Sequence, residues 1–169
     1  MTRLLGLDPG TAIIGYGVVD VAGQSPPRMI GCGVIRTDAR TSRGERLRTL
    51  YEDLTDLLSQ VRPDVVVLEK LFAFRNVTTV IGVAEARGVM LLACEQAGHE
   101  VREVTPMEAK LSIAGHGRAS KQEVQEGVRD LLRLDFVPKP DDAADALALA
   151  LTWLPRLELE PLPGRMEPA

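Results

Sequence analysis

The spacing of apolar positions at the start of the chain predicts a pair of β-strands followed by a third. An apolar run at residues 4–7 ends at Asp8 and a Pro-Gly pair, and a second run, rich in β-branched residues and glycine, covers residues 13–19. Two such runs on either side of a turn predict a β-hairpin with a carboxylate at its mouth. A third strand is expected at residues 29–35, where two glycines are expected to leave room for close backbone approach.

The middle of the chain changes from a helical to a strand pattern. Ser42 and Glu45 have the spacing of a capping box, and leucines then recur at helical spacing until Pro63 ends the predicted helix. Residues 64–69, DVVVLE, form a continuous apolar run closed by an acid, which is typical of a strand buried on both faces in a helix-covered sheet. Glu69 therefore lies at the carboxyl end of this strand, where open α/β sheets bind their ligands.

Residues 77–94 form a predicted helix that is apolar nearly all round. A helix with only one buried side would show a single apolar stripe, so this helix is expected to be buried on two sides. In a domain of this size the second side is expected to contact another subunit. The pattern therefore predicts a homodimer that packs through the 77–94 helix.

The last third of the chain carries shorter elements. The pattern predicts a strand at 100–104, a helix at 105–113, a glycine-rich loop around His116, a helix at 120–132 and a final helix at 141–154. No internal repeat or linker divides the sequence, so we expect one domain over residues 1–154. Residues 155–169 are rich in proline and lack an apolar pattern, and we expect them to form a disordered tail.

The final predicted helix begins DDAADALALALTWL and is almost wholly apolar apart from three acids. Asp142 and Asp145 are three residues apart, so they share one face of the helix, roughly 4.5 Å apart along its axis. Asp141 could serve as the N-cap, and acids in the first turn are favoured by the helix dipole. This explanation fits Asp145 less well, because that residue lies a turn further in, between two alanines.

The acids at the ends of these core elements together predict a metal site. If the strands that end at Asp8 and Glu69 are neighbours and the last helix crosses them, their carboxylates meet the acids of that helix. Four unpaired carboxylates would repel one another and raise each other's pKa. Hard divalent cations such as Mg²⁺ relieve this repulsion, and two such ions about 4 Å apart can hydrolyse a phosphodiester. No Cys/His set has zinc spacing, and no Ser or Cys nucleophile lies in a recognisable catalytic motif.

Composition narrows the class of protein. The 169 residues are 45% hydrophobic and 26% charged, and no apolar run is long enough to cross a bilayer, which predicts a single soluble domain without a membrane partner. No signal peptide is recognisable, and Cys32 and Cys94 are expected to be reduced, so we expect a cytoplasmic location. The net charge of −4 argues against a uniformly basic nucleic-acid binder, but it permits basic residues gathered around an acidic site.

Four segments, in this order and at these spacings, resemble the RuvC family of bacterial Holliday junction resolvases: LGLDPGTAIIGYGVV, VVVLEKLFAFRN, EARGVM and DDAADALALA. The resemblance covers about residues 1–154. It implies a ribonuclease-H-like α/β fold, with a five-stranded mixed sheet and helices on both faces, that works as a homodimer. It also implies cleavage of four-way DNA junctions by paired symmetric nicks that leave 5′-phosphate and 3′-hydroxyl ends. Cooperation with the RuvA–RuvB branch-migration machinery is a further implication.

Carried over by position, the resemblance assigns catalysis and metal binding to four acids, with two Mg²⁺ or Mn²⁺ ions per subunit. These acids are Asp8, Glu69, Asp142 and Asp145. Phe72 resembles the residue that stacks on a base at the junction crossover, and such stacking is worth roughly 1–3 kcal/mol. Lys110 and Lys121 match basic positions that contact DNA phosphates. The full set of expected DNA contacts is Phe72, Phe74, Arg75, Asn76, Lys110, Arg118 and Lys121.

Three other functions stay open at this point. Sugar-kinase and actin-like ATPases begin with a similar phosphate-gripping hairpin, but they need two such domains, and 169 residues with one hairpin argue against them. A catalytically silent dimeric DNA-binding module is a second possibility, which the presence of all four acids disfavours. A metal-dependent nuclease acting on RNA or on another branched substrate would carry the same acids, because function depends on the surroundings of the site.

Overall fold

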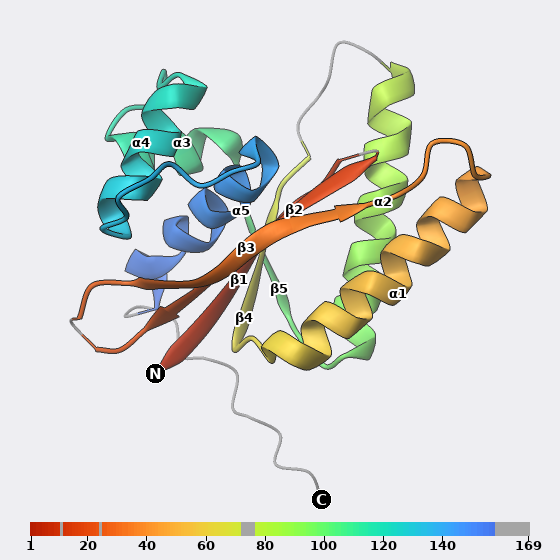
Figure 1. The fold of residues 1–169 in the computed structure, drawn as a ribbon, viewed down its shortest axis with the longest axis horizontal. Coiled ribbons are helices and arrows are strands. Elements are labelled where there is room, and N and C mark those ends of the chain that lie inside the picture. Colours follow the sequence, from red (N-terminus) through yellow and green to blue (C-terminus); the bar gives the residue numbers. More distant parts are fainter. Residues whose placement is uncertain (11, 24, 72–76, 158–169) are drawn as a thin grey trace, which may run out of the picture.

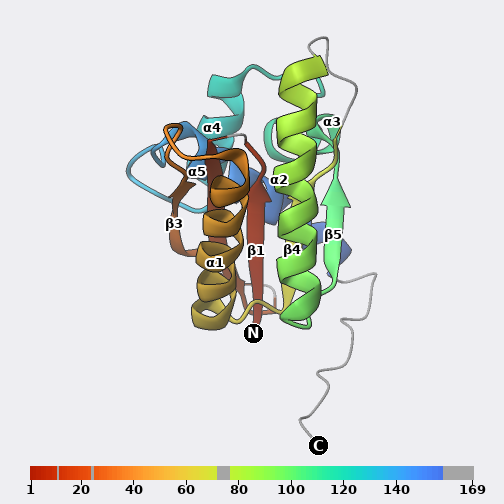
Figure 2. The same ribbon diagram turned by 90° about the vertical axis from the view of Figure 1, so that its right-hand side faces the viewer.

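A five-stranded mixed sheet with the strand order β3-β2-β1-β4-β5 forms the centre of the molecule (Figures 1 and 2). The computed structural model describes residues 1–10, 12–23, 25–71 and 77–157. The first three strands form an antiparallel meander, and β4 and β5 continue the sheet parallel to β1. The strands are β1 (Thr2–Asp8), β2 (Ile13–Val21), β3 (Arg28–Arg36), β4 (Val65–Glu69) and β5 (Val101–Val104). The predicted hairpin, third strand and central strand are therefore confirmed.

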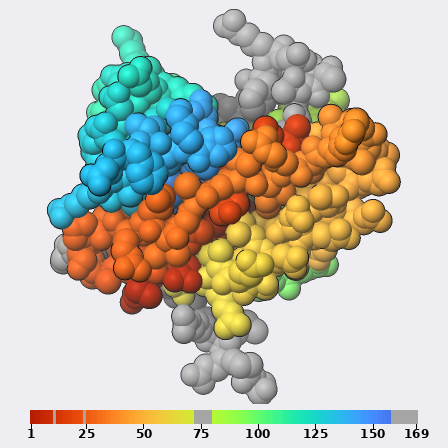
Figure 3. All heavy atoms as spheres, in the orientation of Figure 1, coloured from red at the N-terminus to blue at the C-terminus, as the bar shows by residue number. Residues whose placement is uncertain are grey.

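Helices cover both faces of the sheet, as predicted (Figure 1). The helices α1 and α2 lie on one face and α3, α4 and α5 on the other. In the space-filling view, β3 runs in orange between the cyan and blue α4–α5 side and the orange and yellow α1 (Figure 3). No helix in the described part of the chain is both long and apolar enough to cross a membrane. The helices are α1 (Arg43–Val61), α2 (Val77–Gln96), α3 (Pro106–Ala114), α4 (Lys121–Leu131), α5 (Asp141–Thr152) and the 3₁₀ turn η1 (Leu154–Arg156).

The sheet separates two apolar cores. Along β4, Val66 and Leu68 pack on the α1–α2 side, whereas Val65 and Val67 pack on the α4–α5 side. All four side chains are at most 4% exposed. This alternation explains the continuous apolar run in the sequence, because both faces of the strand are buried.

Three helices begin at capping boxes. In each box the cap side chain accepts a hydrogen bond from a backbone N–H of the first turn, and an acid accepts one from the backbone N–H of the cap. The pairs are Ser42 with Glu45, Thr105 with Glu108 and Ser120 with Glu123. The predicted starts of α1, α3 and α4 are therefore confirmed.

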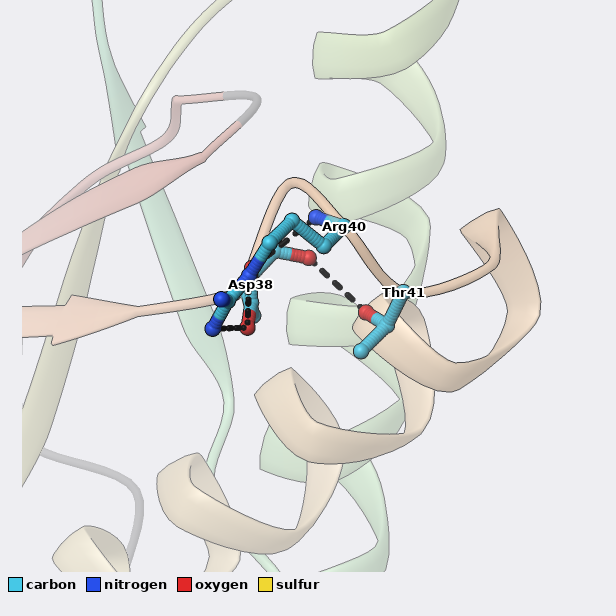
Figure 4. A network of polar contacts seen from close by, with 3 residues as sticks. All are labelled: Asp38, Arg40 and Thr41. Atoms are coloured by element: carbon cyan, nitrogen blue, oxygen red, sulfur yellow. Dashed lines mark hydrogen bonds and ion pairs between the residues drawn. The ribbon is translucent and has the colours of Figure 1, made fainter.

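Asp38 organises the connection from β3 to α1 (Figure 4). Its carboxylate accepts the backbone N–H of Arg40 at 2.9 Å, and its carbonyl accepts the hydroxyl of Thr41 at 2.8 Å. The Arg40 guanidinium also donates to this carboxylate, and these hydrogen bonds hold the pKa of Asp38 below its usual value. The group is exposed, so its main effect is to set the direction in which the chain enters the helix.

The helix α5 begins at Asp141, as predicted, but it ends at Thr152, before the predicted end at residue 154. Pro140, with an extended backbone, occupies the N-cap position and makes no side-chain capping bond, so the possibility that Asp141 is the N-cap is ruled out. Asp141 is instead the first helical residue, and its carboxylate accepts a hydrogen bond from Lys139 at 2.8 Å. The α-helix ends at Thr152, and a 3₁₀ turn follows it.

The first residues of the expected tail belong to this 3₁₀ turn. Arg156 lies over the ring of Trp153, with its guanidinium carbon 4.7 Å from the ring centroid, and it pairs with Glu108 at 2.6 Å. Residues 158–169 lie outside the described residues. The domain boundary at residue 154 and the disorder of the tail stay predictions.

The helix α5 lies directly on the backbone of the first two strands, at three glycines. An added Cβ would lie 1.9 Å from the carbonyl oxygen of Ala146 at Gly6, 1.9 Å from that of Asp142 at Gly15, and 2.7 Å from the backbone nitrogen of Leu147 at Gly17. Real Cβ atoms do not come this close, so only glycine permits this helix position.

The glycines of β3 behave differently from the expectation. A Cβ at Gly31 would meet nothing within 4 Å, and a Cβ at Gly33 would meet the side chain of Tyr16 rather than a backbone. The expected close backbone approach at these two positions is therefore wrong. The strand lies next to β2 at the edge of the sheet, so no helix backbone presses on its glycines.

Replacing Gly15 with alanine should destabilise the protein by about 3 kcal/mol or more, because the new methyl group must displace the backbone of α5. The free energy of unfolding, measured with urea, tests this. Gly31→Ala is the matched control, and it should change stability by at most about 1 kcal/mol, in the stabilising direction. Equal effects of the two substitutions would contradict the packing described for α5.

Candidate active site

Three elements bring the acids to one edge of the sheet. The strands β1 and β4 are adjacent and parallel, with Leu7 opposite Leu68, so Asp8 and Glu69 end neighbouring strands side by side. On the other side of β1, Asp8 is the register partner of Gly15, and the carbonyl oxygen of Asp142 lies against that glycine. Packing of α5 on the glycines thus places the α5 acids beside the strand ends.

The electrostatics of Asp8 show that the other three acids lie close enough to act on its carboxylate. Burial, and then the negative charges of Glu69, Asp145 and Asp142, raise the pKa of Asp8 to about 8. Lys121 is the opposing positive charge. The convergence expected from the sequence is therefore present in the structure.

Glu69 and Asp145 also hold their protons more tightly than usual. Burial raises the pKa of Glu69, and the charge of Asp145 adds to the rise. Burial likewise raises the pKa of Asp145, although the hydrogen bond from Lys121 opposes the shift. The site therefore contains more negative charge than its own residues can compensate.

Lys121 is the cation of this cluster. Its ammonium lies 3.0 Å from Asp145 and 3.6 Å from Asp141. Burial acts to lower the pKa of Lys121, but the hydrogen bond to Asp145 and the surrounding negative charges outweigh it, and the pKa is raised. From the sequence, Lys121 was expected to contact DNA phosphate only, and neither its contact with the acids nor the pairing of Lys139 with Asp141 was predicted.

The chemistry of the four acids suits a divalent cation, because their carboxylates are oxygen ligands with uncompensated negative charge. Their present orientations are not those of a formed metal shell. Within residues 1–10, 12–23, 25–71 and 77–157, no three Asp, Glu, His or Cys side chains are arranged around one point as metal ligands. The Lys121 ammonium holds Asp145 in its present place.

A cleft of about 230 Å³ opens on these residues. It contains three of the four acids together with two lysines that the sequence analysis selected as phosphate contacts. The lining residues are Asp8, Glu69, Pro106, Ala109, Lys110, Lys121, Val124, Asp145, Ala148 and Leu149. Acids and lysines in one concave site suit a substrate that is itself a phosphodiester.

A larger cavity, of about 370 Å³, lies on the opposite face between α1 and α2. Among the described residues that line it, Glu85 is the one acid, and it pairs with Arg43 of α1. It contains none of the four clustered acids, so its size does not make it the better candidate for chemistry.

The other residues selected from the sequence are more scattered. Arg118 is exposed in the loop before α4, and it does not line the cleft. His116 lies beside the capping acid Glu123, with 3.4 Å between Nε2 and the carboxylate. Phe72, Phe74, Arg75 and Asn76 lie outside the described residues, so their predicted DNA contacts stay predictions.

Comparison with known proteins identifies the family. Residues 4–153 match the family model for crossover junction endodeoxyribonuclease RuvC. The chain belongs to the RuvC family. A RuvC protein of Thermomicrobium roseum is 51% identical over 151 residues, which cover 89% of this chain and 91% of the relative. A RuvC protein of Heliobacterium modesticaldum is 49% identical over 156 residues, which cover 89% and 96%.

Solved RuvC structures have the same fold. Thermus thermophilus RuvC superimposes with a TM-score of 0.86 at 34% identity, covering 94% of this chain and 96% of that one. A structure of T. thermophilus RuvC in complex with a Holliday junction substrate gives a TM-score of 0.86 at 36% identity, covering 91% and 93%. The ribonuclease-H-like fold is confirmed, and the ATPase alternative is set aside because the chain belongs to a nuclease family over nearly its whole length.

The raised pKa of Asp8 predicts how stability depends on pH in the metal-free protein. Between pH 4 and 8 the folded state keeps a proton on Asp8 that the unfolded chain releases, so stability should fall as pH rises through this range. One such group contributes at most about 1.4 kcal/mol per pH unit. Asp8→Asn should therefore stabilise the protein much more at pH 8 than at pH 5, as measured by urea unfolding in EDTA. The same gain at both values would show that the acids do not repel as described.

Proposed function

We propose that this protein is a structure-selective endonuclease that resolves four-way DNA junctions. It makes paired symmetric nicks, which leave 5′-phosphate and 3′-hydroxyl ends. The observation that carries the proposal is a cluster of four acids at one sheet edge in a chain that matches the RuvC family over residues 4–153. The relative solved in complex with a Holliday junction substrate supports the choice of DNA substrate.

We further propose that the acid cluster holds two Mg²⁺ or Mn²⁺ ions in each subunit. Asp8 and Glu69 on the strands, with Asp142 and Asp145 on α5, supply the carboxylates. Bound ions of this kind supply an activated water and stabilise the leaving oxygen of a phosphodiester. Asp8, flanked by the other three acids, is the residue best placed to serve both ions.

The basic residues of the cleft are proposed to hold the DNA backbone. Lys110 and Lys121 line the same cleft as Asp8 and Glu69, so a phosphate bound by these lysines would lie at the acids. Lys121 follows the N-cap of α4, which also favours a phosphate. With a net charge of −4, the protein concentrates its positive charge locally, and its affinity for DNA should fall as salt rises.

Two alternative functions predict results in a cleavage assay that differ from those of a junction resolvase. A silent junction-binding module would bind the junction without cutting it. Such a module would gain nothing from four buried acids that repel one another, and their burial costs free energy. A nuclease for RNA or for another branched substrate would cut without preferring a four-way DNA junction. Stacking of Phe72 on an unpaired base at the crossover is the proposed source of that preference.

A homodimer through α2 is proposed to present two active sites to two opposed strands. Exposed apolar or small residues recur along one side of this helix, and Ile81 and Leu92, three turns apart, are 48% and 51% exposed. The residues between them on this stripe, Ala84 and Gly88, are small and exposed. Such a stripe matches its own copy in a two-fold interface. The RuvA–RuvB complex in the cytoplasm is the proposed further partner.

Cleavage of a synthetic four-way DNA junction tests the proposed activity. With Mg²⁺ or Mn²⁺ we expect paired nicks in the junction, and we expect none in EDTA or in a linear duplex of the same sequence. Equal cutting of the duplex would indicate a general nuclease. Binding of the junction without cutting in either metal would favour the silent module.

Asp8→Asn should lower the cleavage rate by at least about a thousandfold, because ion binding at this site supplies several kcal/mol of transition-state stabilisation. Junction affinity should stay within about threefold, since the lysines of the cleft are intact. A variant that still nicks the junction would show that Asp8 is not a catalytic ligand.

Leu92→Glu should convert the dimer into a monomer at micromolar concentration, because it places two carboxylates in an apolar two-fold interface. Light scattering coupled to gel filtration measures the mass. Leu131→Glu on α4, where the parent side chain is 40% exposed, is the control and should leave the mass unchanged. A parent protein that is itself monomeric would overturn the proposed interface.

A further inference from the structure

Arg87 is a largely buried cation on α2 that contacts the end of β4. Its side chain is only 13% exposed. Its Nε donates a hydrogen bond to the backbone carbonyl of Glu69 at 3.3 Å, and its terminal nitrogen pairs with Glu103 on β5. One side chain therefore joins α2 to the ends of two neighbouring strands.

Such a residue is costly for packing alone. Burial of a guanidinium lowers the pKa of Arg87, and it costs free energy unless every donor finds a partner. The neighbouring α2 residues Ala86 and Met90 are apolar and almost fully buried, so an apolar side chain at position 87 would pack well on this side of the helix. The planar fork of arginine is suited to bind a carbonyl and a carboxylate at once, which an apolar side chain does not do.

The contact lies where β4 ends and the chain leaves the sheet. Glu69 pairs with Val104 in the last register position, and the N–H of Lys70 donates to the carbonyl of Val104 at 2.8 Å. Arg87 binds the carbonyl of Glu69 from the helix side, so the peptide that follows Glu69 is held by both β5 and α2. The direction of the Glu69 side chain depends on this peptide, because Cβ is fixed relative to the backbone.

Arg87 acts on the backbone of Glu69 and not on the charge of its carboxylate. The causes that raise the pKa of Glu69 are its own burial and the charge of Asp145. We propose that Arg87 is a positioning residue, which aims the Glu69 carboxylate at Asp8 and Asp145 by fixing the carbonyl of Glu69. This inference rests on the proposed function, in which Glu69 takes part in cleavage.

Arg87→Lys tests the inference, because it keeps the positive charge and loses the fork. The single-turnover cleavage rate of a bound four-way junction should fall about 10- to 100-fold, which is the usual effect of losing a group that orients a ligand side chain. Junction affinity should stay within about twofold, since Arg87 does not line the cleft. A role in stability alone would reduce the folded fraction but would leave the rate per folded molecule unchanged, and that result would overturn the inference.

A further variant separates the two contacts of Arg87, and a second variant serves as the control. Glu103→Gln removes the ion pair but leaves the bond to the Glu69 carbonyl, so it should lower stability and keep the rate per folded molecule within about threefold. A loss in Glu103→Gln as large as that in Arg87→Lys would overturn the inference. Arg43→Lys, which alters the exposed pair with Glu85 on the same helix, is the matched control and should cut at the parental rate.

Glu69→Gln distinguishes failure of this inference from failure of the proposed function. If Glu69→Gln is inactive and Arg87→Lys cuts normally, Arg87 does not position Glu69 and the function stands. If Glu69→Gln cuts normally, the proposed role of Glu69 is wrong and the inference falls with it.

Discussion

The direct packing of α5 on strand backbone is the contact on which the rest of the structure depends. Because Gly6 and Gly15 have no side chains, the helix carbonyls of Ala146 and Asp142 rest on the first two strands. Asp8 is the register partner of Gly15, so the same contact that closes one core also sets the distance between the strand acid and the helix acids. The packing of α5 on these glycines therefore determines both the fold and the arrangement of the acids.

The price of that geometry is electrostatic. Bringing acids together in a buried place raises the pKa of Asp8 to about 8, and Lys121 offsets only part of the repulsion. The protein tolerates this because the sheet beneath is anchored on both faces by apolar cores. Repulsion among these acids destabilises the folded protein when no cation is bound. Such repulsion is expected at a cation site, because a bound cation relieves it and so stabilises the folded state.

The sequence was most informative where a local rule decides the structure. Capping boxes and the apolar run of β4 located the helix starts and the central strand, because each depends on residues within a few positions. It failed where the deciding partner is distant in sequence: Gly15 packs on α5, and Arg87 reaches back to Glu69. Gly31 was misjudged for the same reason, since only the assembled sheet shows which glycines a helix covers.

The two faces of the sheet differ in how much they can be redesigned. On the α1–α2 face, large side chains such as Leu50, Leu54 and Leu58 fill the space between helix and strands, so volume can be exchanged among neighbours. At the glycines under α5, helix and sheet touch through backbone, and there is no side-chain volume to exchange. A stabilised variant is therefore easier to engineer from the first face, whereas the second allows little beyond its present small residues.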